Sequence, residues 1–187
     1  NYRALTRCQL SKDKDALIVR TVTHFGEENL LDSNVKLICS ATIGFDHIDT
    51  EYCDNNGVEW RTAPGCNANS VEQYITSSLL YLAEKYNFDL KEKTIGIVGV
   101  GNVGSKVETA CKKLGMRVIL NDPPREDKEG LSIFADIETI KREADFITFH
   151  TPLIKNGEYK TFHLADDKFF DEVLRKPFIM NASRGGV

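Results

Sequence analysis

Short apolar runs alternate with more polar segments along the first third of the chain. Three runs of apolar or β-branched residues predict strands, at residues 16–19 (ALIV), 35–39 (VKLIC) and 58–61 (VEWR). The segments between them, residues 27–31 and 49–56, have compositions that favour helices. This order predicts a small α/β unit with a parallel sheet. The unbroken apolar character of the first two runs indicates strands that are covered on both faces.

The periodicity changes after Pro64-Gly65, a pair that breaks the chain. Ser70, with Gln73 three residues later, resembles a capping box and predicts that a long helix opens there. Apolar positions then recur at spacings of three and four, which predicts one helical face packed into a core. These positions are Val71, Tyr74, Ile75, Leu79, Leu82, Ala83 and Tyr86.

The rest of the chain repeats the alternation of strand and helix. An apolar run at residues 94–98 leads into glycines and then into a helical pattern that Gly115 should end. Strands alternating with helices predict a Rossmann doubly wound parallel sheet. The later elements that we expect are a strand from Arg117 that ends at Asp122, a Pro-Pro loop, a helix near 137–142, and strands at 146–149 and 178–180. We place two domains at residues 1–70 and 71–187.

Composition narrows the class of partner. The 187 residues carry 24 basic and 28 acidic side chains, a net charge of −4 at pH 7, without a block of like charges. We therefore expect neither a nucleic-acid partner nor a membrane partner, but a small molecule. No run approaches the roughly 18 apolar residues of a membrane span, and the N-terminus lacks a secretory pattern, so the cytoplasm is the expected location.

The cysteines indicate a reduced protein. They are five in number, widely scattered and never in a C-x-x-C pair, so the sequence predicts neither a disulfide framework nor a metal site. They are Cys8, Cys39, Cys53, Cys66 and Cys111.

Both ends of the sequence indicate that it is part of a longer chain. It begins with Asn1 rather than Met, and it ends at Val187, in a loop directly after a strand-like run. A natural domain rarely ends where a strand meets a loop that should feed the next helix. We therefore expect an incomplete chain.

A glycine motif carries the main chemical signal. Residues 99–104 read GVGNVG, which matches G-x-G-x-x-G, although three glycines at this spacing arise by chance in about one such chain in twenty. Here the motif leaves an apolar strand, opens a helix and precedes an acid at the end of the next strand, as dinucleotide sites do. Gly99 would permit the tight turn, Gly101 would admit the pyrophosphate, and Gly104 would let helix and strand pack closely. The alternative is a glycine turn without a ligand.

Asp122 predicts which nicotinamide cofactor is used. A carboxylate there would accept hydrogen bonds from the adenosine ribose and favour NAD over NADP. A 2′-phosphate about 4 Å away would meet roughly 4 kcal/mol of repulsion per charge pair at an effective dielectric of about 20. Arg125 could in principle offset this repulsion. The alternative interpretation of Asp122 is a surface acid in a turn.

Arg184, in the segment NASRGG, follows the last predicted strand. That position is the ligand-facing carboxyl edge of an open α/β sheet. A guanidinium there could bind a substrate carboxylate through two parallel hydrogen bonds and polarise the adjacent oxygen. Taken alone, an arginine near a chain end is usually solvated, so only its surroundings favour this role.

The segments TIGIVGVGNVGSKV, LNDPPR, FHTPL and NASRGGV together resemble the nucleotide-binding domain of the D-2-hydroxyacid dehydrogenases, over nearly the whole chain. The resemblance implies an NAD-dependent oxidoreductase. Within the family, four segments resemble members that act on a phosphorylated hydroxyacid: ATIGFDHID, APGCNANSVEQY, NDPPRED, and FHTPL followed by GEYKTFHLAD. The resemblance also implies that residues 1–70 are part of a smaller, flavodoxin-like substrate domain, and that the full-length protein is a homodimer.

The resemblance assigns roles to single residues. It implies that Arg184 is the catalytic arginine and that Thr21 and Thr42 contact the substrate. The position of Thr21 is serine in relatives, so an added methyl group must fit there. Without the resemblance, both threonines would be ordinary turn or strand residues. The residues expected at NAD are Gly99, Gly101, Asn102, Val103, Gly104, Asp122, Thr151, Ala182 and Ser183.

One part of the family pattern is not matched. The family's catalytic acid is a histidine oriented by a glutamate, both after the arginine motif, so we expect these 187 residues alone to be inactive. We interpret the histidines present as structural or solvent-exposed; they are His24, His47, His150 and His163. Two alternatives stay open: a family member with another small hydroxyacid substrate, and a non-catalytic NAD-sensing module on the same fold.

Overall fold

Two parallel sheets organise the chain, one in each of two units. The computed structural model describes residues 13–130 and 132–187. Unit 1 runs to Asn67 and unit 2 covers Ala68–Val187, so the division falls at residue 67 rather than at the predicted residue 70.

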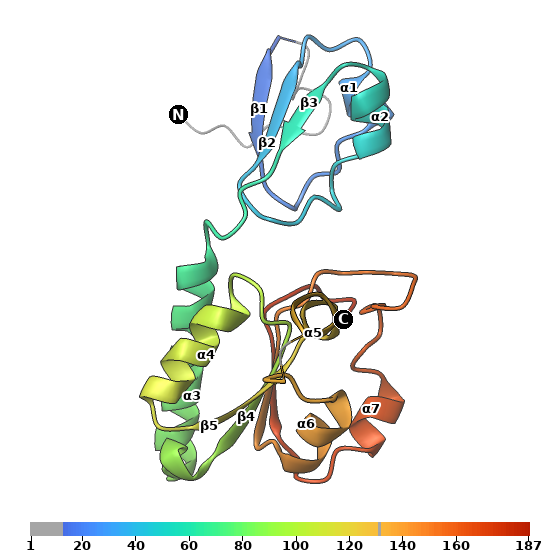
Figure 1. Cartoon of the computed structure of the whole chain (residues 1–187). Coiled ribbons are helices and arrows are strands. Elements are labelled where there is room, and N and C mark those ends of the chain that lie inside the picture. Colours follow the sequence, from blue (N-terminus) through green and yellow to red (C-terminus); the bar gives the residue numbers. More distant parts are fainter. Residues whose placement is uncertain (1–12, 131) are drawn as a thin grey trace. The chain divides into compact units, whose positions relative to one another are not determined.

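Unit 1 contains a three-stranded sheet in the order β1-β2-β3. Its elements, shown in Figure 1, are β1 (Ala16–Val19), α1 (Glu27–Leu30), β2 (Leu37–Ser40), α2 (Thr50–Asn55) and β3 (Glu59–Arg61). Asp49 fixes the start of α2, because its side chain accepts a hydrogen bond from the Tyr52 N–H at 2.9 Å. The predicted β-α-β-α-β order is therefore confirmed.

Among the described residues, the expected cover on both faces is wrong for β1 and only partial for β2. Along β1, Leu17 and Val19 are buried, whereas Ile18 is 85% exposed. The helices α1 and α2 pack against the buried face, through Leu30 and Cys53. An unbroken apolar run therefore does not show whether one face or both faces of a strand are covered.

Unit 2 contains a four-stranded parallel sheet in the order β5-β4-β6-β7. The strands are β4 (Thr94–Val98), β5 (Arg117–Asn121), β6 (Phe146–Phe149) and β7 (Phe178–Asn181). The chain passes from β4 outward to β5, then crosses back to β6 on the other side of β4. This reversal makes a Rossmann-like sheet with a topological switch point beside β4.

Helices cover both faces of the sheet of unit 2 (Figure 1). On one face lie α3 (Ala68–Tyr86) and α4 (Gly104–Lys113), and on the other lie α6 (Ile137–Glu143) and α7 (Asp167–Asp171). A short 3-10 helix, η1 (Leu90–Glu92), joins α3 to β4. Because both faces are covered, every residue of β4 is buried.

Two details of α3 differ from the prediction. The helix begins at Ala68, so Ser70 lies inside the first turn and the predicted start is wrong. Ile75 and Leu79 are fully buried, but Tyr74 and Tyr86 are more than half exposed. The buried face of α3 is therefore narrower than the apolar stripe in the sequence. Tyrosine is suited to the edge of this face, because its ring can pack while its hydroxyl stays in water.

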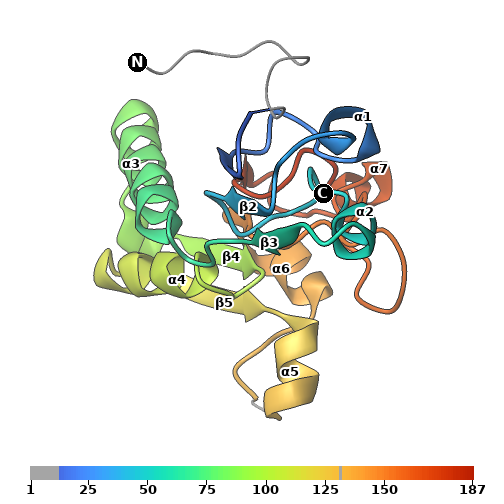
Figure 2. The same cartoon turned by 90° about the horizontal axis from the view of Figure 1, so that it is seen from above.

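The segment after β5 is a helix, and the predicted Pro-Pro loop is wrong. In α5 (Pro123–Glu129) the two prolines occupy the first positions, where a helix needs no N–H donor. Asp122 caps this helix by accepting a hydrogen bond from the Arg125 N–H at 3.2 Å. Gly130, with φ of 63°, ends it in the left-handed conformation. Figure 2 shows α5 beyond the end of β5.

The described part of the chain contains no helix that is both long and apolar enough to cross a membrane. Four of the predicted reduced cysteines are free thiols: Cys39, Cys53, Cys66 and Cys111. Cys8 lies outside the described residues.

Candidate cofactor site

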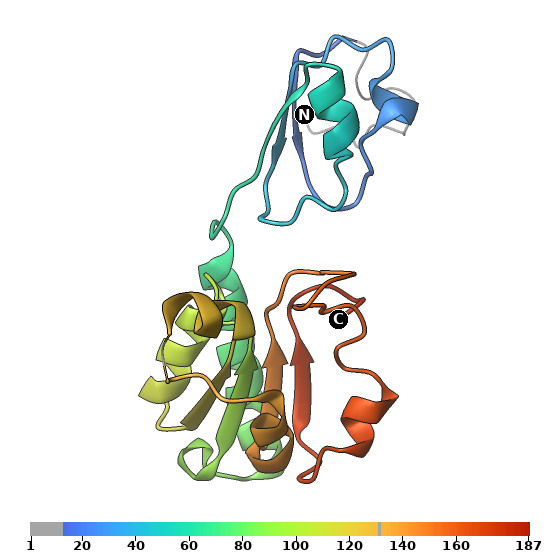
Figure 3. The same cartoon turned by 45° about the vertical axis from the view of Figure 1, so that its right-hand side comes forward.

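The glycine loop lies at the carboxyl edge of the unit 2 sheet, between β4 and α4 (Figure 3). Gly99 has φ of 87°, and a Cβ there would lie 2.8 Å from the His150 carbonyl carbon. A Cβ on Gly104 would lie 2.1 Å from the Gly99 oxygen, so α4 can close on the turn only with glycine. A Cβ on Gly101 would meet nothing within 4 Å. Gly101 therefore borders open space in which a phosphate has room.

The start of α4 offers hydrogen-bond donors to that space. The Ser105 N–H donates to the Gly101 oxygen and the Val107 N–H to the Val103 oxygen, both at 3.0 Å. Within the ranges that the structure describes, the backbone N–H groups of Asn102 and Val103 have no hydrogen-bond partner. Free N–H groups at the positive end of a helix suit a phosphate.

Asp122 faces back toward the glycine loop. Its Oδ2 accepts a hydrogen bond from the Val100 N–H at 2.7 Å, while Oδ1 accepts from the Arg125 N–H. A carboxylate has about four acceptor positions, so this one retains capacity for ribose hydroxyls. The contact with Val100 was not predicted, because the spacing of the motif shows an acid near the loop but not a bond to it.

The end of β6 lies against Gly99 and contains two buried polar atoms. Thr151 Oγ1 and His150 Nδ1 have no hydrogen-bond partner among the described residues. The other ring nitrogen of His150 lies 3.0 Å from the Thr148 hydroxyl. Burial lowers the pKa of His150 to about 4, so the ring is neutral at pH 7. Thr151 thus presents an unsatisfied hydroxyl beside the loop, where the sequence predicted a cofactor contact.

The loop after β7 reaches the same edge. Asn181 shapes it, since its Oδ1 accepts hydrogen bonds from the Ser183 N–H at 2.9 Å and hydroxyl at 2.7 Å. Its Nδ2 donates to the Arg184 carbonyl oxygen at 3.0 Å. The Ala182 N–H donates to the Phe149 oxygen at 3.2 Å, which ties this loop to β6. Ala182, Ser183 and Arg184 therefore lie at the carboxyl edge that also bears the glycine loop and Thr151.

The two predicted substrate residues lie in unit 1. Val19 pairs with Ser40, and Thr21 and Thr42 each lie two residues further on, so both follow the carboxyl ends of adjacent strands. The Thr42 hydroxyl donates to the Gly44 oxygen at 3.2 Å, and the Thr21 side chain is exposed.

Two of the four histidines are largely buried and two are exposed. His47 is buried, with Nε2 3.3 Å from the Ser40 hydroxyl, and His150 is mostly buried. His24 and His163 are exposed. Across residues 13–130 and 132–187, no three His, Cys, Asp or Glu side chains gather as a metal would require.

Comparisons with known proteins agree with the fold. Residues 69–187 match the family described as D-isomer specific 2-hydroxyacid dehydrogenase, NAD binding domain. Erythronate-4-phosphate dehydrogenase of Bacteroides thetaiotaomicron is 58% identical over 179 residues, which cover 96% of this chain and 51% of that protein. The chain thus spans about half the length of this curated relative.

Two solved structures resemble the chain. D-lactate dehydrogenase from Aquifex aeolicus, complexed with NAD and lactic acid, is 26% identical with a TM-score of 0.76, covering 94% of this chain and 58% of that one. NAD+-bound 3-phosphoglycerate dehydrogenase from Entamoeba histolytica is 27% identical with a TM-score of 0.76, covering 94% of this chain and 57% of that one. The chain belongs to the D-isomer specific 2-hydroxyacid dehydrogenase family, and residues 69–187 are its NAD-binding domain.

Proposed function

We propose that this chain belongs to an enzyme that oxidises 4-phospho-D-erythronate to 3-hydroxy-2-oxo-4-phosphooxybutanoate with NAD, a step of pyridoxal phosphate synthesis. The observation that carries the proposal is the 58% identity to an erythronate-4-phosphate dehydrogenase over 96% of this chain. In this proposal unit 1 is part of a flavodoxin-like substrate domain, with Thr21 and Thr42 at the substrate. The complete enzyme would be a homodimer.

Three features of unit 2 fit NAD. The open space at Gly101 and the free N–H groups of Asn102 and Val103 suit a pyrophosphate. The spare acceptor capacity of Asp122 suits the two hydroxyls of the adenosine ribose. The buried Thr151 hydroxyl lacks a partner among the described residues, and a hydrogen-bonding group of the cofactor would supply one. We assign Ala182 and Ser183, at the same edge, to the cofactor as well.

The chemistry divides between the cofactor and the protein. NAD, when bound, supplies the acceptor for the hydride that leaves the substrate carbon. Arg184 binds the substrate carboxylate and places fixed positive charge beside the oxygen that becomes a carbonyl. The hydroxyl proton must pass to a base with a pKa near the working pH. The buried His150, with a pKa of about 4, is poorly matched to that task. We therefore assign the proton to a residue of the whole enzyme outside this sequence.

NAD binding is tested by calorimetric titration of the chain. We expect saturable binding, and we expect Gly101→Ala to weaken it roughly tenfold, about 1.4 kcal/mol, because a Cβ would enter the space proposed for the pyrophosphate. The same substitution should leave the unfolding free energy nearly unchanged, since nothing lies within 4 Å of that Cβ. Absence of saturable binding by the folded chain would contradict the proposal.

The substrate is tested with the complete enzyme that contains this sequence. We expect NADH formation with 4-phospho-D-erythronate to exceed that with 3-phosphoglycerate. The reverse preference would move the protein to another member of the family. NAD binding without oxidation of either acid would instead favour an NAD-sensing role.

A further inference from the structure

An ion pair on α5 reaches back to the glycine loop. Arg125 Nε and Nη2 donate to the two carboxylate oxygens of Glu129 at 2.7 and 2.8 Å. Arg125 Nη1 donates to the Val100 carbonyl oxygen at 2.7 Å. The guanidinium also lies 5.3 Å from the centre of the Phe134 ring. All three nitrogens of this guanidinium are therefore engaged, and its plane is fixed.

Hydrogen bonds hold Val100 through both its carbonyl oxygen and its N–H. Its carbonyl oxygen accepts a second hydrogen bond, from the Ser105 hydroxyl at 3.0 Å. Its N–H donates to Asp122 Oδ2 at 2.7 Å. Val100 lies between Gly99 and Gly101, so these contacts fix the part of the loop next to the proposed phosphate space. A loop ordered before the ligand arrives loses less entropy when the ligand binds.

The ion pair is charged and partly protected from water. The side chains of Arg125 and Glu129 are 34% and 32% exposed. The hydrogen bond with Arg125 lowers the pKa of the Glu129 carboxyl, and that with Glu129 raises the pKa of Arg125. Both groups are therefore ionised at neutral pH. Two parallel hydrogen bonds between a guanidinium and a carboxylate also fix orientation, which a single bond does not.

Arg125 is three residues after Asp122, where a mobile guanidinium would be able to neutralise the 2′-phosphate of NADP. We propose that Glu129 determines the nucleotide preference of this site by holding Arg125 on the Val100 carbonyl, where it orders the glycine loop and does not reach a 2′-phosphate. This inference rests on the proposed NAD site. Glu129 acts through Arg125 and is a positioning residue rather than a catalytic one.

The test is a set of variants titrated with NAD and with NADP: Glu129→Gln, Asp122→Asn and the double variant. Glutamine keeps the size of Glu129 but removes its charge. In Glu129→Gln alone, the charge of the Asp122 carboxylate still attracts the released Arg125 and repels a 2′-phosphate, so the preference for NAD should fall only a few-fold. In the double variant both the repulsion and the restraint are gone. For the double variant we expect the ratio of the NADP to the NAD dissociation constant to fall. This fall should be roughly tenfold larger than the product of the falls in the two single variants.

Two further variants make the result specific. Adding Arg125→Ala to the double variant should abolish the gain in NADP binding, because the gain requires the guanidinium. Glu143→Gln is the matched control: it breaks a 2.6 Å ion pair with Arg117, at the start of β5 and so at the opposite edge of the sheet, and should leave the ratio unchanged. A general loosening of the loop weakens the binding of both nucleotides alike, so it leaves the ratio of the two dissociation constants unchanged.

The outcomes separate the two proposals. If the parent chain binds NAD but the double variant has the same ratio as Asp122→Asn, the role of Glu129 is overturned and the NAD site stands. The same conclusion follows if the gain survives Arg125→Ala. If the folded parent chain binds neither nucleotide, the proposed NAD site itself fails.

Discussion

At the scale of single residues, the end of β6 combines burial with unsatisfied polarity. His150 Nδ1 and Thr151 Oγ1 are buried without hydrogen-bond partners among the described residues. A buried polar atom without a partner costs on the order of 1–3 kcal/mol. Thr151 lies beside Gly99, where a bound cofactor would offset its cost. The cost of His150 has a different consequence, because an imidazole can also take up a proton.

His150 should make the folded protein sensitive to acid. Burial lowers its pKa from 6.5 to about 4, so the unfolded chain takes up this proton first as the pH falls. The stability tied to the neutral ring is complete above about pH 6.5 and falls until the pH reaches the folded value. We expect a loss of about 2 kcal/mol between pH 7 and pH 5 from this residue.

Urea unfolding of the parent chain and of His150→Gln at several pH values measures this loss. Glutamine keeps an amide near the Thr148 hydroxyl but does not titrate. Between pH 7 and pH 5, the unfolding free energy of His150→Gln should therefore fall by about 2 kcal/mol less than that of the parent chain. Equal slopes for the two proteins would contradict the prediction.

Single residues also show what the sequence could and could not predict. The conformation of Gly99 and the close packing at Gly104 follow from the motif, because its spacing encodes backbone geometry. The contacts of Arg125 with Val100 and Glu129 do not follow from it. They require α5 to be helical, so that Arg125 and Glu129 lie on one face, whereas the two prolines in the sequence predict a loop.

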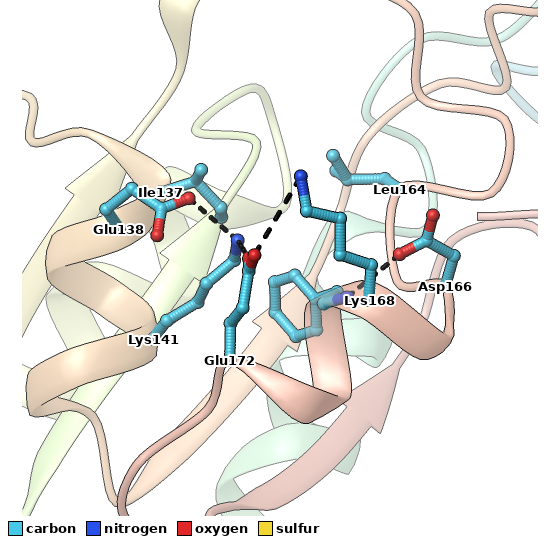
Figure 4. Close-up of a pocket in the computed structure, with 8 residues that line it drawn as sticks. Ile137, Glu138, Lys141, Leu164, Asp166, Lys168 and Glu172 are labelled. Carbon is cyan, nitrogen blue, oxygen red and sulfur yellow. Dashed lines mark hydrogen bonds and ion pairs between the residues drawn. The ribbon is translucent and has the colours of Figure 1, made fainter.

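At the scale of elements, a buried lysine joins α6 to α7. Lys141 Nζ donates to Glu138 on its own helix at 2.7 Å and to Glu172, which follows α7, at 2.6 Å. Burial lowers the pKa of Lys141, but the hydrogen bonds to the two carboxylates outweigh burial and raise it. Figure 4 shows this cluster at a pocket between the two helices, with Lys168 above Glu172. The charged lysine thus fixes how the short α7 packs.

Replacement of Lys141 should destabilise unit 2 by an amount that depends on how much of the side chain is removed. The Lys141 side chain is only 9% exposed, so Lys141→Ala removes buried methylene groups as well as the ion pairs and should cost about 2–3 kcal/mol. Lys141→Met keeps the apolar stem and should cost about 1 kcal/mol, because water can reach the carboxylates that are left.

Urea unfolding measures both costs. The control is Lys168→Ala, since the Lys168 side chain is 81% exposed and lies 3.8 Å from Glu172; it should change stability by less than about 0.5 kcal/mol. If Lys141→Ala cost no more than this control, Lys141 would not join the helices.

The elements differ in how clearly the sequence predicts them. The strands β4 and β6 follow from their short, mostly apolar runs, TIGIV and FITF, in which every residue is buried. The helix α7 was missed because its five residues, DKFFD, are too few to show a helical period. The helix α5 has no buried residue, so its limits depend on the cap at Asp122 and on Gly130 rather than on periodicity.

At the scale of the whole molecule, each unit has its own core. The cluster of unit 1 lies between Leu17 and Trp60 in the sequence, and the two clusters of unit 2 lie between Ile75 and Val187. The residues proposed for NAD, from Gly99 to Ser183, all belong to unit 2. Cofactor binding should therefore depend on unit 2, whereas the proposed substrate contacts of Thr21 and Thr42 require unit 1.

A protein consisting of Ala68–Val187 tests this division. A unit with its own core and its own sheet should fold alone, so we expect cooperative urea unfolding and an NAD dissociation constant within about threefold of that of the whole chain. Calorimetric titration measures the constant, and Gly101→Ala in the shorter protein should weaken binding as it does in the longer one. If the shorter protein folds but does not bind NAD, the glycine loop depends on unit 1 for its shape. If it does not fold, the core between Ile75 and Val187 is insufficient by itself.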